Sequence, residues 1–254
     1  MALSTEALQP EAKRWEVADI FQEFGERYRN KNRLPRTHLK VMHAIEVCRT
    51  SYLGGHVQKC DTCGFEHHAY NSCRNRHCPK CQGLKKAQWV EDRKAEVLPV
   101  PYFHNVFTLP HELNPIALCN RKAIYSMLFK AVSETLLQFG RNNLGGTLGF
   151  TAILHAGDQR LLEHLHLHCV IAGGVLAGDK TRWIQTKNNY LFNVEALSIV
   201  FRGKFLEYLE KAHAKEELKF PGNTAKYAMG EEFSGLIKTL RAKDWVVFSK
   251  KPFA

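Results

Sequence analysis

The spacing of apolar residues along the first fifty positions predicts two amphipathic helices. Val17, Ile20, Phe21 and Phe24 recur at helical spacing, which predicts a helix over residues 15–30. A second helix is expected over residues 35–49, where apolar side chains form a stripe and a proline suits the first turn. This stripe consists of Val41, Ala44, Ile45 and Cys48. The chain therefore opens with a helical segment.

Further along the chain, apolar runs predict strands with long helices between some of them. Strands are expected over residues 103–109, 145–156, 183–184, 190–192 and 245–248. Helices are expected near 83–98 and over 116–139, 194–214 and 231–242. Pro110 stops the first strand, and Gly173-Gly174 is expected to end another strand that begins near residue 163. Strands joined mostly by hairpins, with helices between some, indicate an α+β domain around an antiparallel sheet.

The strand that begins near residue 163 carries a histidine at every second position. In the run His164-Leu165-His166-Leu167-His168, period two sends three imidazoles to one face and the leucines into a core. Two neutral imidazoles aimed at one point make a divalent-metal site that still needs a third ligand from elsewhere. The alternative is a solvated strand face that carries histidines by chance. Three in a row on an otherwise apolar strand speak against it.

Two C-x-x-C pairs match the spacing of a four-cysteine zinc site. Cys60 and Cys63 form the first pair and Cys78 and Cys81 the second, about 15 residues later. Each pair offers two thiolates from a tight turn, so two pairs complete the tetrahedron that Zn²⁺ prefers. Gly64 follows the first pair, where the turn requires a positive φ. A redox C-x-x-C would instead stand alone beside a strand–helix unit.

The loop between these pairs leaves part of the ligand set open and is rich in positive charge. Cys73 and His77 lie there, and Cys73 either replaces one of the four ligands or stays a free thiol. Basic residues surround the second pair, which favours contact with phosphate groups. The expected DNA-binding residues are Arg74, Arg76, Lys80, Lys85 and Lys86.

The charge of the whole chain narrows the class of partner. The formal net charge of +11 favours an acidic partner, with nucleic acid first and an anionic membrane surface second. No apolar run approaches the roughly 20 residues that a membrane helix needs, and residues 1–9 lack the features of a signal peptide. We therefore expect no membrane partner and a cytoplasmic location, where the eight cysteines are reduced thiols or metal ligands.

The length of 254 residues leaves room for one domain of ordinary size and a smaller module. A linker bounded by Pro99 and Pro101 separates the two. Residues 1–98 are expected to form a helical and zinc-binding module that contacts DNA. Residues 99–254 are expected to form the α+β domain with the histidine strand.

The order of the motifs along the chain resembles a known family. The motifs are SCRNRHCPKC at 72–81, FTLPHELNP at 107–115, ILH at 153–155, HLHLHCVIAGG at 164–174 and FRGKFL at 201–206. An H-hydrophobic-H strand preceded by a strand ending in FTL is similar to the HUH superfamily of single-strand DNA endonucleases. The full series resembles the zinc-binding transposases of rolling-circle insertion sequences. This resemblance covers nearly all of the chain from about Val17 onward.

The resemblance implies an enzyme of DNA transposition that nicks and joins single-stranded transposon ends. In such an enzyme Mg²⁺ or Mn²⁺ on His166 and His168 polarises the scissile phosphate, and a tyrosine attacks it to form a 5′-phosphotyrosine link. His155 and Gln159 are the candidates for the third ligand. Family members often carry a histidine at the position of His164 with a proline after it, and this chain has leucine there instead.

The resemblance breaks off before the catalytic tyrosine. In the family this residue follows the segment that corresponds to 245–253, whereas the sequence stops at Ala254. We therefore expect a truncated transposase, with an incomplete HUH domain over 99–254. Residues 208–211 fit the Y-x-x-K pattern of rolling-circle replication initiators, which makes Tyr208 a candidate nucleophile. Apolar neighbours on its helix face favour a core or rim tyrosine instead.

Two other classes of function fit part of the sequence. A non-catalytic, zinc-containing DNA-binding remnant would occupy transposon ends without cutting them. A metallohydrolase of the amidohydrolase kind also uses an H-x-H strand, but it needs further histidines and an aspartate on later strands of a barrel. Only His213 follows His168, and the strand–helix repeat of a barrel is missing.

Overall fold

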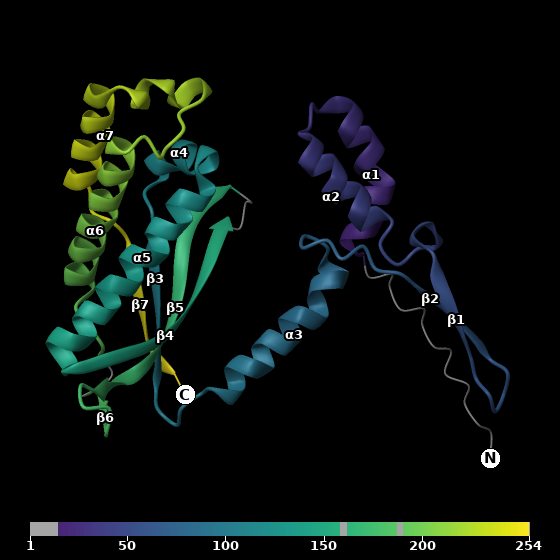
Figure 1. The fold of residues 1–254 in the computed structure, drawn as a ribbon, viewed down its shortest axis with the longest axis horizontal. Helices are drawn as coiled ribbons and strands as arrows, with labels where there is room; N and C mark the ends of the chain where they lie inside the picture. The colour runs from purple at the N-terminus through teal and green to yellow at the C-terminus, as the bar shows by residue number, and fades with distance from the viewer. Residues whose placement is uncertain (1–14, 158–161, 187–189, 254) are drawn as a thin grey trace, which may run out of the picture. The chain divides into compact units, whose positions relative to one another are not determined.

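The computed structural model describes residues 15–157, 162–186 and 190–253 (Figure 1). The chain divides into two compact units, Met1–Val97 and Leu98–Ala254. This division lies beside the boundary predicted at residues 98 and 99. Each unit has a hydrophobic core of its own.

The first unit consists of helices and one small hairpin. Its elements are α1 (Val17–Lys31), α2 (Arg36–Glu46), the 3-10 helix η1 (Ser51–Leu53), β1 (Gly55–Lys59), β2 (Glu66–Tyr70) and α3 (Pro79–Ala95). The three predicted helices are confirmed. Helix α3 begins at Pro79, earlier than expected, because the fixed φ of proline suits the first helical position. The buried core of this unit is small and consists of Ala18, Ile45, Cys48 and Cys78.

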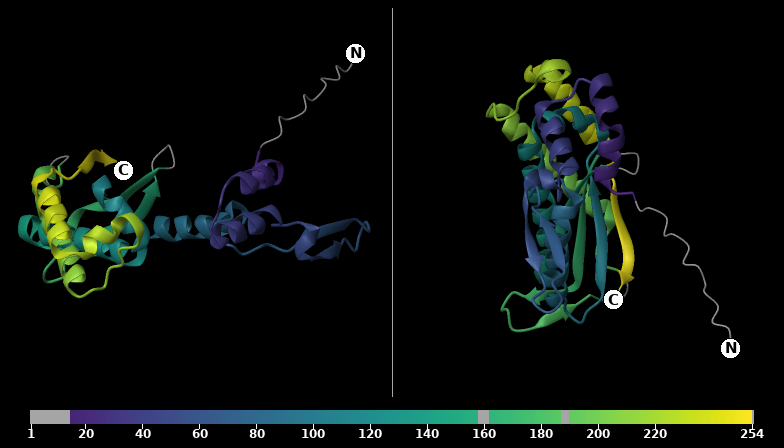
Figure 2. Two further views of the ribbon diagram at one scale, coloured as in Figure 1. Left: turned by 90° about the horizontal axis from the view of Figure 1, so that it is seen from above. Right: turned by 90° about the vertical axis from the view of Figure 1, so that its right-hand side faces the viewer.

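The hairpin of β1 and β2 was not predicted. All of β1 and most of β2 are exposed, so neither strand shows the alternation that a buried face imposes. The two strands pair antiparallel, with Val57 opposite His68, and extend as a ribbon away from α1 and α2 (Figure 2). Cys60 and Cys63 lie in the turn that joins them. Gly64 has a φ of 72° there, as the turn chemistry predicts.

The second unit is an antiparallel sheet with helices packed on it, which confirms the predicted α+β architecture. Its strands are β3 (Tyr102–Thr108), β4 (Gly146–Gly157), β5 (Glu163–Ala177), β6 (Trp183–Gln185) and β7 (Val247–Phe253). Its helices are η2 (His111–Leu113), α4 (Asn114–Cys119), α5 (Arg121–Phe139), η3 (Gly140–Leu144), α6 (Val194–Ala214), η4 (Gly222–Ala228) and α7 (Gly230–Ala242). In the described residues, no helix is long and apolar enough to span a bilayer.

Strand β5 lies inside the sheet, whose order is β4-β5-β3-β7, with β6 paired to the end of β5. Every pairing is antiparallel. Leu165 and Leu167 of β5 face the core, where they join Leu128 of α5 and Phe201 of α6. Helices α5 and α6 run along this face of the sheet (Figure 1). Because strand side chains alternate, the histidines of β5 lie on the opposite face.

Several details of the second unit differ from the predictions. Gly173-Gly174 does not end β5, which continues to Ala177. A Cβ at Gly174 would lie 2.4 Å from Trp183 Nε1, so glycine serves close packing here, not a turn. Residues 190–192 form no strand, and Leu191 and Phe192 are buried in the segment before α6.

The helix expected over 116–139 is interrupted at Asn120, which separates α4 from α5. The backbone of Asn120 has φ −128° and ψ 36°, outside the helical region. Its side-chain amide donates to the carbonyl oxygens of Ile116 and Lys219, at 2.9 and 2.8 Å. A buried asparagine thus satisfies backbone groups that the break leaves open.

Candidate metal centres

The histidine face of the sheet brings together residues from two neighbouring strands. His166 and His168 of β5 lie on the face that α5 and α6 leave open, and His155 of β4 pairs directly with His166. Potential ligand atoms of His155, His166 and His168 all lie within 4.8 Å of one another. His155 Nδ1 is 3.1 Å from His166 Nε2. Of the two predicted candidates for a third ligand, His155 is part of the cluster and Gln159 lies outside the described residues.

The chemistry of these donors fits a divalent ion. Two nitrogens bound to one ion at about 2.1 Å lie about 3.0 to 3.4 Å apart, close to the observed distance between His155 and His166. His166 Nδ1 lies 2.8 Å from the carbonyl oxygen of His164, to which it can donate. That hydrogen bond fixes the tautomer and leaves the lone pair of His166 Nε2 for a metal.

His104 of β3 adds a fourth imidazole that the sequence analysis missed. Its Nε2 lies 2.9 Å from His168 Nδ1, and the two rings stack with centroids 5.1 Å apart. In the β3–β5 register, His104 pairs with Val170, so it lies diagonally from His168 on the same face. Alternation along the predicted strand 103–109 places His104 and Val106 on the same face. It does not show that this strand pairs with the histidine strand, so the contact with His168 could not be predicted. His104 is thus placed to orient the ring of His168.

Burial prepares two of these imidazoles for coordination. Desolvation lowers the pKa of His166. The hydrogen bond to the His164 carbonyl opposes this shift, whereas charge repulsion from the rings of His164 and His155 adds to it. Desolvation also lowers the pKa of His168, assisted by His166, His104 and His155. Imidazoles with lowered pKa values are neutral at neutral pH, which is the form that binds metal ions.

A second cluster lies in the first unit and consists of Cys48, Cys73, Cys78 and Cys81. Their sulfur atoms lie within 4.8 Å of one another, and Cys81 Sγ is 3.5 Å from both Cys48 Sγ and Cys73 Sγ. Four thiolates around one zinc at about 2.3 Å would lie roughly 3.8 Å apart. The four cysteines therefore fit a tetrahedral zinc site.

The predicted ligand set shares only two members with this cluster. Cys78 and Cys81 belong to it, whereas Cys60 and Cys63 are exposed in the hairpin turn. Cys48, which the sequence placed in the apolar stripe of a helix, follows α2 and is buried beside the cluster's other sulfurs. Cys73 is the open alternative that the sequence had named. His77 is exposed and accepts a hydrogen bond from Arg76.

The four thiols of the cluster differ in their pKa values. Burial raises the pKa of Cys73 to about 12. Burial acts in the same direction on Cys81, but hydrogen bonds from Cys48, Cys73 and Cys78 outweigh it and lower the pKa of Cys81 to about 7. A thiol that ionises near neutral pH beside three others is a good first ligand for a metal ion.

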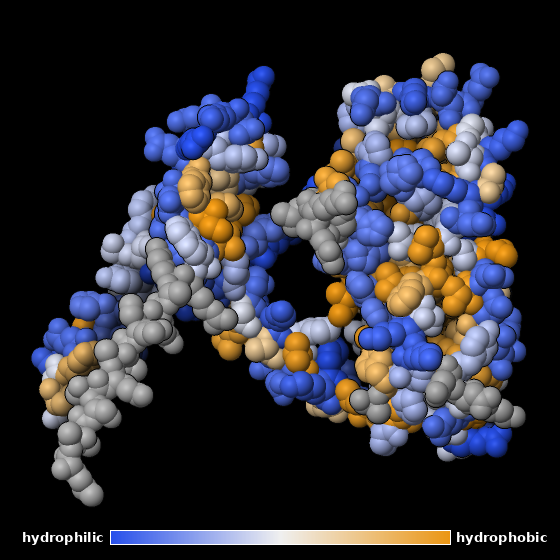
Figure 3. All heavy atoms as spheres, turned by 180° about the vertical axis from the view of Figure 1, so that it is seen from behind, coloured by the Kyte–Doolittle hydropathy of each residue, from blue (hydrophilic) through white to orange (hydrophobic). Residues whose placement is uncertain are grey.

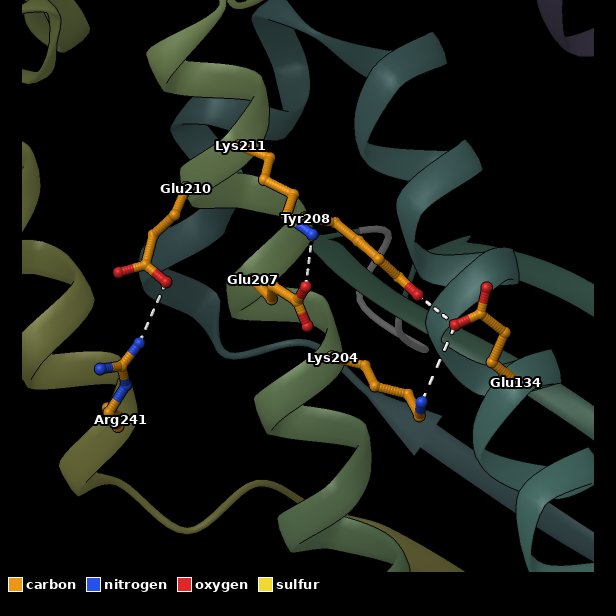
Figure 4. A network of polar contacts seen from close by, with 7 residues as sticks. All are labelled: Glu134, Lys204, Glu207, Tyr208, Glu210, Lys211 and Arg241. Carbon is orange, nitrogen blue, oxygen red and sulfur yellow. Dashed lines mark hydrogen bonds and ion pairs between the residues drawn. The ribbon is translucent and has the colours of Figure 1, made fainter.

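Tyr208, the candidate nucleophile of the Y-x-x-K pattern, lies on the helical side of the sheet. Its hydroxyl donates to Glu134 of α5, as Figure 4 shows, and Lys130 Nζ lies 4.5 Å from the centroid of its ring. Burial and the hydrogen bond to Glu134 raise the pKa of Tyr208 to about 12. The sheet stands between Tyr208 and the histidine cluster, so the structure does not bring the two together.

The five predicted DNA-binding residues differ in their surroundings. Lys80 forms an ion pair with Glu16 at 2.6 Å. Arg74, Arg76, Lys85 and Lys86 are exposed, and within the described residues none of them forms an ion pair with an acidic group. Four of the five are therefore open to an anionic partner.

Among solved structures, the chain is similar to conjugative relaxase TrwC. The metal-bound complex of TrwC with OriT DNA is 19% identical, with 55% of this chain and 64% of that chain covered and a TM-score of 0.37. A TrwC complex with a 27-mer DNA that comprises the recognition hairpin and the cleavage site is 21% identical, with 42% and 44% covered and the same TM-score.

Two curated relatives are transposases. "Putative transposase y4qJ" of Sinorhizobium fredii is 48% identical over 242 residues, which span 94% of this chain and 61% of the relative. The transposase for insertion sequence element IS801 of Pseudomonas savastanoi pv. phaseolicola is 27% identical over 207 residues, or 81% and 48% of the two chains. The chain thus spans about half to three-fifths of the length of these relatives.

Two family models match the chain, and together they contain both clusters. The model described as "Transposase zinc-binding domain" matches residues 20–109, which include the four clustered cysteines. The model described as "Putative transposase" matches residues 149–254, which include His155, His166 and His168. The chain belongs to the zinc-binding transposase family that also includes the transposase of insertion sequence element IS801.

Proposed function

We propose that the chain binds single-stranded transposon ends in the cytoplasm and holds the divalent ion with which a transposase nicks and joins DNA. The observation that carries this proposal is the convergence of His155, His166 and His168 on one face of the sheet. Family membership and the net charge of +11 support DNA as the partner.

The histidine face supplies binding and orientation for this chemistry. Mg²⁺ or Mn²⁺ held by the three histidines would act as a Lewis acid on a phosphoryl oxygen. Strand β5 has neighbours on both sides, which keeps His166 and His168 in fixed positions. The His164 carbonyl and the His104 ring hold their tautomers and ring planes.

Apolar side chains on the same face of the sheet as the histidines offer a surface for bases. Phe248 pairs with Val106, which pairs in turn with His168, so all three lie on one face. Phe248 is 53% exposed, and an exposed aromatic ring beside a phosphate site can stack with an unpaired base. Figure 3 shows hydrophobic residues among hydrophilic ones over one face of the second unit.

The nucleophile of the proposed reaction is a residue other than Tyr208. The Tyr208 hydroxyl donates a hydrogen bond to Glu134 on the helical side of the sheet, away from the histidines. Its raised pKa also makes it difficult to ionise. The complete histidine cluster also does not favour a remnant that only occupies DNA ends. We propose structural zinc on Cys48, Cys73, Cys78 and Cys81, which the match to a zinc-binding domain supports.

A denaturing gel tests the catalytic proposal. The protein is incubated with Mn²⁺ and a labelled oligonucleotide that carries the cognate transposon end. We expect a non-covalent complex and no covalent band from residues 1–254. A version extended through the tyrosine run that the family implies should give a covalent band, and a His166→Ala/His168→Ala variant of it should not.

Two outcomes would contradict this scheme. A covalent band from residues 1–254 that disappears in Tyr208→Phe would make Tyr208 the nucleophile. A lack of binding to single-stranded DNA even at low salt would remove DNA as the partner.

A further inference from the structure

A basic pocket borders the cysteine cluster of the first unit. Its volume is about 500 Å³, and Arg49, His68, Tyr70, Asn71 and Arg74 are among the residues that line it. As far as the structure is described, no aspartate or glutamate lines this pocket. The pocket thus places two positively charged side chains and an aromatic ring next to one another in the first unit.

Both arginines hold an unusual backbone conformation. Arg49 has a φ of 59° and Arg74 a φ of 53°, in the left-handed region that disfavours residues with a Cβ. Each arginine directly follows a cysteine of the cluster, Cys48 or Cys73. The backbone therefore turns sharply after each of these sulfurs, and both turns send an arginine to the same pocket.

Hydrogen bonds fix the two turns relative to each other. The Arg49 amide donates to the carbonyl oxygen of Asn71 at 3.1 Å. The Asn71 amide and side chain donate to the carbonyl oxygens of Gly54 and Leu53, each at 3.0 Å. The Asn75 amide points at Cys73 Sγ, 3.5 Å away. The spacing of the arginines thus depends on the same segments that hold the cysteine cluster.

Several other cations of the first unit are paired with acidic residues. Arg29 is paired with Glu46, Lys59 with Glu66 and Lys80 with Glu16. Arg49 and Arg74 form no ion pair with any described acidic residue. Strained backbone that carries unpaired charge into a pocket is typical of a binding site and not of a surface optimised for stability.

We propose that this pocket binds a phosphodiester group of DNA, with Arg49 and Arg74 on the phosphate oxygens and Tyr70 beside a base. Arginine forks match phosphate geometry, and Tyr70 is 45% exposed and so available for stacking. The inference rests on the DNA binding proposed above and adds the place where the zinc module makes its main contact. Arg74 was predicted from the sequence, whereas Arg49 comes from the structure alone.

A double variant, Arg49→Gly/Arg74→Gly, tests the pocket. Glycine tolerates positive φ, so the variant should keep its zinc and melt at the same temperature as the original chain or higher. Binding to a single-stranded oligonucleotide is measured by fluorescence anisotropy between 50 and 300 mM salt. Loss of two phosphate contacts should reduce the slope of log K against log salt by about 1.4, which is about a 25-fold loss of affinity at 0.1 M salt.

A matched control removes two other unpaired cations of the same unit. Arg27→Ala/Arg33→Ala lowers the net charge equally and should leave most of the slope in place. Arg49→Lys/Arg74→Lys should also retain the slope, because the charges remain. An unchanged slope in the glycine variant, or an equal decrease of the slope in the control, would show that the pocket is not the phosphate site. The proposed binding of DNA by the chain would not be affected by this result. If the unmodified chain shows no salt-dependent binding at all, the proposed DNA partner fails, and the pocket with it.

Discussion

His104 shows how much the role of one residue depends on its neighbours. Its ring stacks on that of His168, and its Nε2 lies 2.9 Å from His168 Nδ1. A second partner that donates to or accepts from a ligating imidazole fixes the orientation of the ligand. His104 is thus expected to act on the metal through His168.

Replacement of His104 should weaken metal binding without unfolding the sheet. We expect His104→Ala to reduce Mn²⁺ affinity about 10- to 100-fold, because loss of such a partner typically has that effect. Titration calorimetry with Mn²⁺ measures it. His164→Ala is the matched control, since His166 bonds to the backbone carbonyl of His164 and not to its ring. Equal affinities for His104→Ala and the original chain would exclude the orienting role.

Tyr208→Phe should affect stability and not DNA chemistry. Loss of the hydrogen bond to Glu134 should lower the free energy of unfolding by about 1 kcal/mol at neutral pH. The pKa of Tyr208 is about 12 in the folded chain, above its ordinary value of 10, so the unfolded state ionises first. Stability should therefore fall between pH 10 and pH 12, and this part of the decline should be absent in the variant.

Urea unfolding at several pH values checks this prediction. The metal affinity of Tyr208→Phe should match that of the original chain, because the sheet separates this residue from the histidines. A large loss of Mn²⁺ affinity in the variant would contradict the placement of Tyr208 on the helical side.

At the scale of elements, the loops around α2 and α3 decide which cysteines meet. The end of α2 delivers Cys48, the first turn of α3 delivers Cys81, and the segment before α3 delivers Cys73 and Cys78. The hairpin of β1 and β2 projects from between these elements and keeps its own C-x-x-C pair at the exposed turn. The two C-x-x-C pairs thus differ: Cys78 and Cys81 belong to the cluster, whereas Cys60 and Cys63 do not.

Single cysteine variants should separate the two possible ligand sets. Cys73→Ser should lower the zinc content to well below one ion per chain, whereas Cys60→Ser should leave it near one, because only Cys73 belongs to the buried cluster. Metal analysis of protein purified without chelator gives both values. Loss of zinc in Cys60→Ser with retention in Cys73→Ser would restore the set predicted from the sequence.

The sequence predicted the elements that bury one face and missed those that do not. Helix α6 has the predicted bounds, Val194–Ala214, since its apolar positions follow the core. The β1–β2 hairpin is exposed on both faces, so its sequence shows no alternation of apolar and polar residues. Gly173 and Gly174 predict a strand end wrongly because a sequence does not reveal which backbone or ring approaches a glycine.

The candidate sites were predicted where motif and geometry coincide. Alternation placed His166 and His168 on one face correctly, and the motif ILH added His155. His104 and Cys48 escaped prediction because each reaches its cluster through tertiary contacts. His104 needs the register between β3 and β5, and Cys48 lies 33 residues before Cys81, its partner in the cluster.

The two units of the whole chain depend on very different amounts of buried surface. The second has a large core that draws on the sheet and on helices α4 to α7, whereas the core of the first is a cluster of four buried residues, two of which are cysteines of the metal-binding cluster. Small modules with so little core usually need a metal or a disulfide to fold. We therefore expect the first unit to depend on zinc and the second not to.

Removal of zinc should unfold one unit and spare the other. After treatment with a strong zinc chelator, amide hydrogen exchange should become fast over 17–95 and stay slow in β3, β5 and α6, because only the first unit loses a core component. Hydrogen exchange read by mass spectrometry resolves the two. Slow exchange throughout residues 17–95 after complete loss of zinc would show that the small core suffices alone.

The order of strands in the sheet also sets the order in which the histidine cluster can assemble. His155 and His166 are 11 residues apart in one hairpin, whereas His104 is 64 residues from His168 and must arrive with β3. Closing the longer loop costs about 1.6 kcal/mol more in chain entropy. The β4–β5 hairpin can therefore present three imidazoles before β3 inserts beside β5, and before β7 can pair with β3. A divalent ion captured at that stage would speed refolding, and the fourth imidazole would lock the ring of His168 in one of the last steps.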